Sequence, residues 1–193
     1  MTATATPTIT SVPGYRAGRW VIDPVHSEVA FSVRHLMVSK VRGRFSGFAG
    51  ALVTAEDPLA SSVEATIDLA SVETGSEDRD AHLRSPDFLD VERFPTLTYR
   101  STGIRGDGDR LVVEGDLSLH GVTQSVPLAL EVNGFLPESP FGDSRVGFSA
   151  VGELSRRDFG IEFDAPLEGG GVVVGDKIQI ALEVEAVLQS EDG

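Results

Sequence analysis

The chain has 193 residues, a formal net charge of −14, 40% hydrophobic residues and no cysteine. This length and hydrophobic content suit one globular domain and exclude a disordered chain. The lack of cysteine excludes disulfides and cysteine zinc sites, and the acidic charge argues against nucleic acid or an anionic membrane surface as a partner, because both attract basic proteins.

The first segment of the chain predicts no fixed structure. Residues 1–14 are rich in threonine, alanine and proline and lack the basic start and leucine-rich core of a secretion signal. We therefore expect a disordered tail over residues 1–14, one domain over residues 15–190, and a cytoplasmic location. Residues 117–130, the longest uncharged strand-like run, are too few for a membrane-spanning helix, which needs about 20 apolar residues. We predict no stable insertion into a membrane.

Alternation of apolar and polar residues dominates the remaining sequence. In residues 27–37, the side chains of Val29, Phe31, Val33 and His35 share one face of a predicted strand. The same period of two recurs in residues 63–69, 111–119 and 177–186. Turn signals separate these stretches at short intervals, and the pattern predicts eight or nine antiparallel strands with one dry face. Long strands with 21 glycines in the chain favour a closed barrel over a sandwich.

Residues 74–101 differ from the strands because they mix charged and aromatic side chains. Residues 76–84 predict the single helix, with Ser76 as its N-cap. Phe88, Phe94 and Tyr99 follow, and such rings gain nothing in a solvated linker. We expect this segment to cover an apolar interior at one end of the barrel.

The polar candidates predict neither a metal site nor a catalytic site. The four histidines, at positions 26, 35, 82 and 120, lack the spacing of metal ligands, and no serine lies in a nucleophile motif. His35 falls on an inward face, where it either contacts a ligand or is a core histidine bonded to an inward polar group. Two clusters, Arg79-Asp80 and residues 156–158, are either surface ion pairs or a ring around a cavity mouth that holds an anionic head group.

Several motifs together resemble a known family. They are WVIDPVHS at residues 20–27, FSVRHL at 31–36, VRGRF at 41–45, TG at 74–75, RDAHLRS at 79–85, DFLD at 87–90, FPT at 94–96, GDLSLHGVT at 115–123, RDFG at 157–160 and VGD at 174–176. Their order and spacing are similar to those of the YceI-like family from about residue 15 to residue 187.

The resemblance implies an all-β fold, a lipocalin-like antiparallel barrel of about eight strands with one short helix and an internal hydrophobic tunnel. It also implies binding, storage or transport of a polyisoprenoid of the polyprenyl phosphate or quinone type, with no cofactor beyond such a lipid. Family members are often dimers and many are periplasmic, so a homodimer is one expected assembly. The residues expected to contact the ligand are Val29, Phe31, Val33, His35, Phe45, Ile67, Arg79, Asp80, His82, Phe88, Phe94, Tyr99, Leu117, Leu119, Phe148, Arg157 and Ile180.

Two other functions stay open from the sequence. A small barrel can fill its interior with its own side chains, which would leave a dimeric interaction or stress-response module without a ligand. Alternatively, His35 or His82 together with Asp80 would form an acid/base pair in a lipid-modifying enzyme.

Overall fold

The computed structural model describes residues 12–107, 110–165, 168 and 173–190. Most of the tail predicted for residues 1–14, and residues 169–172 of the glycine-rich loop, lie outside the described residues. The strands are β1 Gly18–Ile22, β2 Glu28–His35, β3 Ser39–Phe45, β4 Phe48–Thr54, β5 Ser62–Asp68, β6 Val72–Glu73, β7 Thr96–Asp107, β8 Arg110–Leu119, β9 Val122–Ser125, β10 Leu128–Leu136, β11 Arg145–Ser155 and β12 Val174–Leu188. Helix α1 spans Glu77–Arg84, and short 3-10 turns span Pro58–Ala60, Leu69–Ser71 and Arg156–Phe159.

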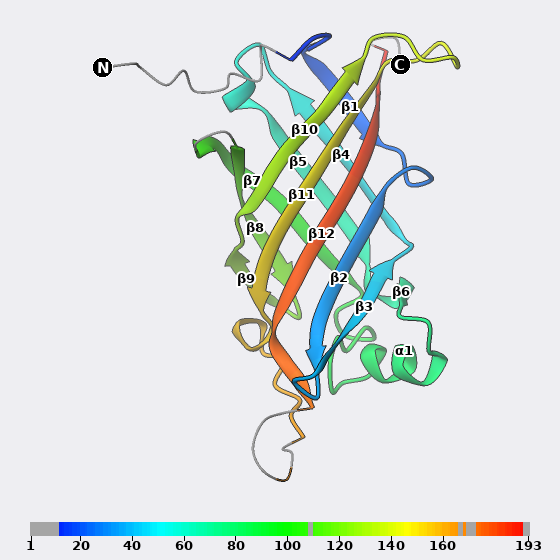
Figure 1. Ribbon diagram of the computed structural model, residues 1–193, viewed down its shortest axis with the longest axis vertical. Helices are drawn as coiled ribbons and strands as arrows, with labels where there is room; N and C mark the ends of the chain where they lie inside the picture. Colours follow the sequence, from blue (N-terminus) through cyan, green and yellow to red (C-terminus); the bar gives the residue numbers. More distant parts are fainter. Residues whose placement is uncertain (1–11, 108–109, 166–167, 169–172, 191–193) are drawn as a thin grey trace.

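The strands close into an antiparallel barrel (Figure 1). The order around the barrel is β1-β4-β5-β7-β8-β10-β11-β12, and β1 pairs with β12, for example Trp20 with Leu188. Strands β2 and β3 prolong β1 and β4, because β12 pairs first with β2 and then with β1 along the same side. The predicted all-β, lipocalin-like barrel of about eight strands with one short helix is therefore confirmed.

Alternating side chains explain why these segments form strands with one apolar face. In β12, Ile178, Ile180 and Leu182 face the interior, whereas Lys177 and Gln179 form polar contacts with Glu153 on the outside. Each inward aliphatic side chain contributes about 1.5–3 kcal/mol when it is fully buried. The barrel wall is thus held by apolar packing inside and by backbone ladders between strands.

A smaller core cluster closes the end of the barrel that is uppermost in Figure 1. Trp20 is fully buried against Val146, Phe148 and Ala186. Its indole Nε1 donates to Thr54 Oγ1 at 2.8 Å, so the ring buries no unpaired donor. Loss of such a ring typically costs about 3–5 kcal/mol.

Helix α1 lies beside the opposite end of the barrel (Figure 1). Its N-cap is Ser76, as predicted, because the Ser76 hydroxyl accepts a hydrogen bond from the Arg79 backbone N–H at 3.4 Å. Arg84, in the last turn, donates to the carbonyls of Ala70 and Val72 and so ties the helix to the barrel. No helix in the described part of the chain has the length and apolarity that a membrane crossing requires.

The hairpin between β2 and β3 ends in an unfavourable turn. The Val38 backbone N–H donates to the His35 carbonyl at 3.2 Å, and both central residues have positive φ, 51° at Leu36 and 61° at Met37. Positive φ at both positions is the signature of a type I′ turn, which favours Asn-Gly. A left-handed conformation costs roughly 1–2 kcal/mol for each residue with a Cβ atom. Leu36 and Met37 therefore occupy this turn although its backbone conformation is unfavourable for both residues.

Candidate functional site

The barrel encloses an apolar cavity of about 300 Å³. Forty of the described residues line it, and only Tyr15, Thr54, Ser61, Ser62, Tyr99 and Arg156 among them are polar or charged. Val174 and Val184, ten positions apart on β12, both contribute to the wall. Ten residues of strand at a barrel tilt extend about 25 Å along the axis, so the cavity is elongated.

Two glycines make room for aromatic rings in the cavity wall. The Phe31 ring lies across Gly43, where an added Cβ would be 2.4 Å from Phe31 Cζ. The Tyr99 ring lies across Gly115 in the same way, at 2.3 Å from such an atom. The Tyr99 hydroxyl donates to the backbone carbonyl of Val126 at 3.1 Å, and burial raises the pKa of Tyr99 above its ordinary value. Tyr99 is therefore a neutral wall residue at physiological pH.

Arg156 is the one charged side chain of the cavity wall within the described ranges. It is only 3% exposed, and its guanidinium donates to the backbone carbonyls of Gly175, Ile161 and Val174 at 3.0, 2.7 and 3.2 Å. These bonds use three of its five N–H groups, and no described carboxylate forms an ion pair with it. Burial lowers the pKa of the Arg156 guanidinium, and the nearby Arg157 lowers it further. The cavity wall thus carries a buried cation with no ion-pair partner among the described carboxylates.

The structure brings eleven of the sequence-predicted site residues to the cavity wall. They are Val29, Phe31, Val33, Phe45, Ile67, Phe88, Tyr99, Leu117, Leu119, Phe148 and Ile180. Each lies at the inward phase of a strand or, for Phe88, in the segment after α1. Their contact with a ligand stays a prediction.

Three predicted residues of α1 do not line the cavity. Arg79 Nε donates to the Thr74 hydroxyl at 2.7 Å, and the buried Asp80 carboxylate accepts from the Thr74 backbone N–H at 2.9 Å. His82 Nε2 lies 2.8 Å from Asp87 Oδ2, so His82 pairs with Asp87 and not with Asp80. The hydrogen bonds of these residues fasten the helix to its own flanking segments, and a charged ring around the cavity mouth stays a prediction.

His35, Phe94 and Arg157 also lie outside the cavity wall. His35 is the last residue of β2, and the cavity lining on this strand ends two residues earlier, at Val33. Phe94 packs against His120 with 4.8 Å between ring centroids, and Arg157 pairs with Asp164 at 2.7 Å. Strand phase predicted an inward face for His35 but not the length of the cavity. Phe94 and Arg157 were predicted from the aromatic content of residues 74–101 and from the arginine cluster at residues 156–158.

Arg156, which the sequence reasoning grouped with Arg157, is the position that enters the cavity. A signal for it exists in the sequence, because the inward residues of β11 recur at every second position. Phe148, Ala150 and Leu154 line the cavity, and two further residues lead to Arg156. The alternation of inward and outward residues in β11 continues into the 3-10 turn, so Arg156 lines the cavity and Arg157 does not.

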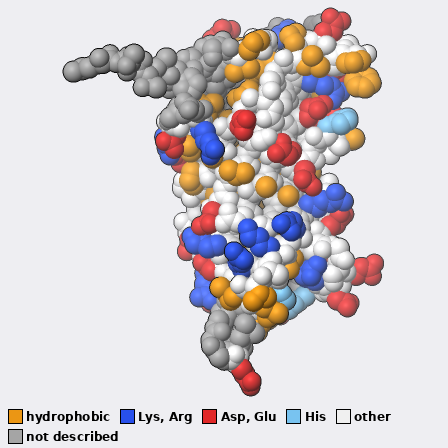
Figure 2. Space-filling model, in the orientation of Figure 1, with side chains coloured by type: hydrophobic (Ala, Val, Ile, Leu, Met, Phe, Trp, Pro, Cys, Tyr) orange, Lys and Arg blue, Asp and Glu red, His pale blue; other side chains and the backbone are white. Residues whose placement is uncertain are grey.

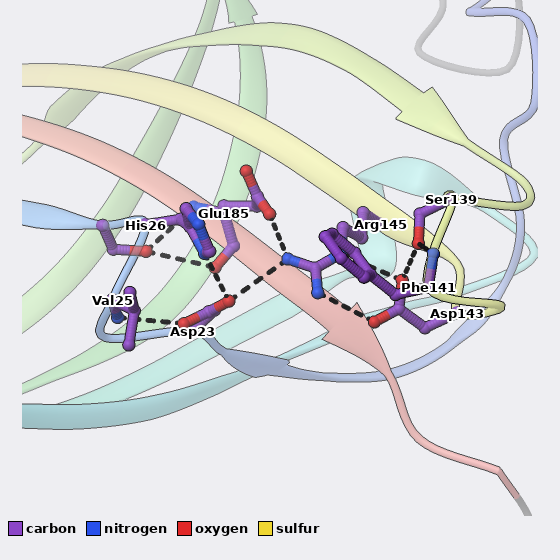
Figure 3. A network of polar contacts seen from close by, with 9 residues as sticks. Asp23, Val25, His26, Ser139, Phe141, Asp143, Arg145 and Glu185 are labelled. Atoms are coloured by element: carbon purple, nitrogen blue, oxygen red, sulfur yellow. Dashed lines mark hydrogen bonds and ion pairs between the residues drawn. The ribbon is translucent and has the colours of Figure 1, made fainter.

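A second polar cluster lies at the interruption between β1 and β2 (Figure 3). Arg145 donates to Asp23 at 3.2 Å, to Asp143 at 2.8 Å and to Glu185, and His26 Nδ1 lies 2.8 Å from Asp23. Ligand atoms of Asp23, His26 and Glu185 lie within 4.8 Å of one another, a spacing that a metal ion could use. Arg145 already supplies the positive charge between the carboxylates, so we interpret the cluster as an ion-pair network that fixes the β1–β2 connection.

This network predicts acid-sensitive stability. The hydrogen bond from His26 holds the pKa of the Asp23 carboxyl below its ordinary value, and Arg145 does the same for Asp143. A lowered folded pKa gives stability that is present above the unfolded pKa of about 3.9 and is lost as the pH falls through the folded value. We expect Arg145→Met to lower the melting temperature more at about pH 7 than at about pH 3, where the carboxylates are partly protonated.

Thermal unfolding followed by circular dichroism at both pH values measures this difference. Arg100→Met is the matched control, because the Arg100–Glu64 pair is exposed and longer, at 3.7 Å. An equal loss for Arg145→Met at the two pH values would contradict the role of the network.

The comparisons with known proteins agree with the fold. The model of the YceI-like domain matches residues 20–186. The chain belongs to the YceI-like family. A family relative, protein YceI of Escherichia coli O157:H7, is 37% identical over 165 residues, which cover 85% of this chain and 83% of that protein.

Solved structures of similar proteins share the barrel. The Campylobacter jejuni YCEI protein is 26% identical, with a TM-score of 0.69, and the match covers 81% of this chain and 90% of that chain. A Saccharophagus degradans domain described as polyisoprenoid binding is 17% identical, with a TM-score of 0.67, and the match covers 90% of this chain and 100% of that chain. At that lower identity the likeness concerns the fold.

Proposed function

We propose that this YceI-like protein binds a long-chain amphiphile of the polyisoprenoid type inside its barrel, for storage or transport and without chemical conversion. The observation that carries the proposal is the elongated apolar cavity with a single charged side chain, Arg156, among its described lining residues. The chain of the amphiphile lies along the cavity, and its head group lies near the guanidinium.

The energetics favour such a ligand. Moving apolar chain out of water gains about 0.8 kcal/mol per CH₂ group, so a dry cavity binds a long chain without directed chemistry. The branched isoprenoid chain matches a wall of valine, leucine, isoleucine and phenylalanine side chains. Affinity then depends mainly on shape and length.

Arg156 supports a head group with acceptor oxygens. An unpaired buried guanidinium is costly, and a phosphate or a quinone carbonyl accepts hydrogen bonds from its remaining N–H groups. The family and the polyisoprenoid-binding S. degradans domain support the same class of ligand. Polyprenyl phosphates and quinones are therefore the head-group classes to test.

The alternatives have weaker support from the cavity. Its described wall contains no carboxylate and no histidine, and Tyr99 stays protonated, so an acid/base pair next to a bound lipid has no candidate there. A ligand-free module needs an interior filled by side chains, whereas this interior contains about 300 Å³ of open space.

Native mass spectrometry of the full chain purified from its host tests the proposal. We expect one lipid-sized adduct per chain, released unchanged by organic extraction and replaced by added polyprenyl phosphate or quinone. Only the bare protein mass, together with no uptake of either added lipid, would overturn the proposal. Recovery of a converted lipid after incubation would favour the enzyme.

A further inference from the structure

We propose that the tip of the β2–β3 hairpin, residues 34–44, docks the protein on the surface of an anionic lipid bilayer. This interaction surface lies on the outside of the barrel, and it stands independently of what the cavity contains. Three features of the hairpin carry the proposal: exposed apolar side chains, an unfavourable turn, and a local excess of cations.

The apolar tip is the first feature. Leu36, Met37 and Val38 are consecutive and are 39%, 55% and 81% exposed. Turn residues are usually glycine, asparagine, aspartate or serine, which interact well with water. A contiguous group of large apolar side chains at an exposed turn instead fits the boundary between lipid head groups and acyl chains.

The conformation of the turn is the second feature. Leu36 and Met37 both have positive φ, which asparagine and glycine adopt more readily. A strained backbone that the sequence retains indicates a function for the side chains displayed there. Here the strained turn carries two exposed apolar side chains.

The charge of the hairpin is the third feature. Residues 34–44 include Arg34, Lys40, Arg42 and Arg44 and no carboxylate, in a chain with a net charge of −14. Arg34 lies directly opposite Lys40 in the ladder, which is unfavourable without a nearby anion. Among the described residues, only Arg44 of these four has an ion-pair partner, Glu73 at 3.1 Å.

Two neighbouring carboxylates are paired with other cations. Glu153 pairs with Lys177 and Asp164 pairs with Arg157, whereas Asp176 accepts from the Ser155 hydroxyl and keeps its charge. Figure 2 shows Lys and Arg side chains gathered on the lower half of the barrel, next to hydrophobic side chains at that end. Charges interact over a Debye length of about 8–10 Å, so this local surface attracts anions although the whole chain is acidic.

The combination favours a bilayer over other polyanions. Cations behind an apolar tip match lipid phosphates above acyl chains, and each basic residue adds about fivefold in affinity for an anionic membrane. A nucleic acid would use the cations but would leave the apolar tip in water. The acidic remainder of the protein is repelled by the same membrane, which orients the hairpin toward it.

Cosedimentation of the full chain with vesicles tests the proposal. We expect wild-type protein to bind vesicles of equal parts phosphatidylcholine and phosphatidylglycerol at least tenfold more tightly than vesicles of phosphatidylcholine alone. Val38→Asp should weaken this binding about tenfold. Val25→Asp is the matched control and should bind like wild type, because Val25 is 80% exposed in the connection at the other end of β2.

Two further variants separate docking from stability. The pair Lys40→Gln with Arg42→Gln should lose about 25-fold in affinity, from about fivefold per cation, whereas Arg100→Gln with Arg105→Gln, on β7, should lose little. Replacing Leu36-Met37 by Asn-Gly should raise the melting temperature and weaken vesicle binding, opposite effects that a purely structural turn would not produce.

Three results would overturn the proposal: equal binding of wild type to both vesicle types, equal binding by Val38→Asp and Val25→Asp, or binding of duplex DNA that depends on Lys40 and Arg42 but not on Val38. Native mass spectrometry of Val38→Asp distinguishes a loss of vesicle binding from a loss of lipid binding in the cavity. We expect that variant to carry the same lipid adduct as wild type.

Discussion

Arg156→Met is expected to weaken the binding of a polyprenyl phosphate by about 10–100-fold, because hydrogen bonds to charged groups contribute about 1.5–3 kcal/mol. The uncharged polyprenol of the same chain length should lose much less, since its chain contacts remain. The substitution also removes the donors to the carbonyls of Gly175, Ile161 and Val174, so the melting temperature should fall.

A titration of both lipids, followed by native mass spectrometry, measures the difference. Arg157→Met is the matched control: it removes the same charge from the adjacent position, but Arg157 pairs with the exposed Asp164 outside the cavity. Arg156→Lys should recover part of the phosphate affinity, because it restores the charge with fewer donors. Equal losses of phosphate and alcohol affinity in Arg156→Met would show that the guanidinium recognises no head group.

Ala150→Trp should abolish uptake of any long-chain lipid. Ala150 lines the cavity from the middle of β11, and an indole there would occupy a large part of a space of about 300 Å³. Because the ring enters an open cavity, the stability cost should stay within the about 1–3 kcal/mol of ordinary overpacking.

Lipid adducts after extraction and reloading provide the measurement, with melting temperature as the test of folding. Ala181→Trp is the control, because Ala181 lies on β12 with its side chain exposed on the outer face. A folded Ala150→Trp variant with wild-type lipid content would mean that the cavity is not the binding site.

Much of the fold could be predicted because strand formation and the burial of one strand face depend on local alternation. The inward phase of Ile178, Ile180 and Leu182 and the N-cap at Ser76 are both visible in a few consecutive residues. Whether the barrel is hollow could not be predicted, because it depends on the summed volume of side chains from all strands. Gly43 receives the Phe31 ring, and only the ladder shows that these two residues are paired.

The candidate site was predicted less well at its polar residues. A motif such as RDAHLRS places charged groups near one another, but its sequence cannot tell whether Asp80 faces a cavity or accepts from Thr74. The network around Asp23 was missed because it depends on Arg145 and Glu185, which are far away in the chain. Side-chain partners of this kind are fixed by barrel closure, which no local pattern contains.

The position of β12 governs when the molecule can form during synthesis. This last strand lies between β11 and the β1–β2 edge, and contacts such as Ser27 with Glu185 span 158 residues. Until β12 has left the ribosome, the nascent chain exposes two open strand edges, at β2 and β11, which can pair with other chains. Such distant pairings also form slowly. The barrel therefore cannot close until residues 174–188 have been synthesised, and the interval before it closes is the period in which this chain most needs protection from aggregation.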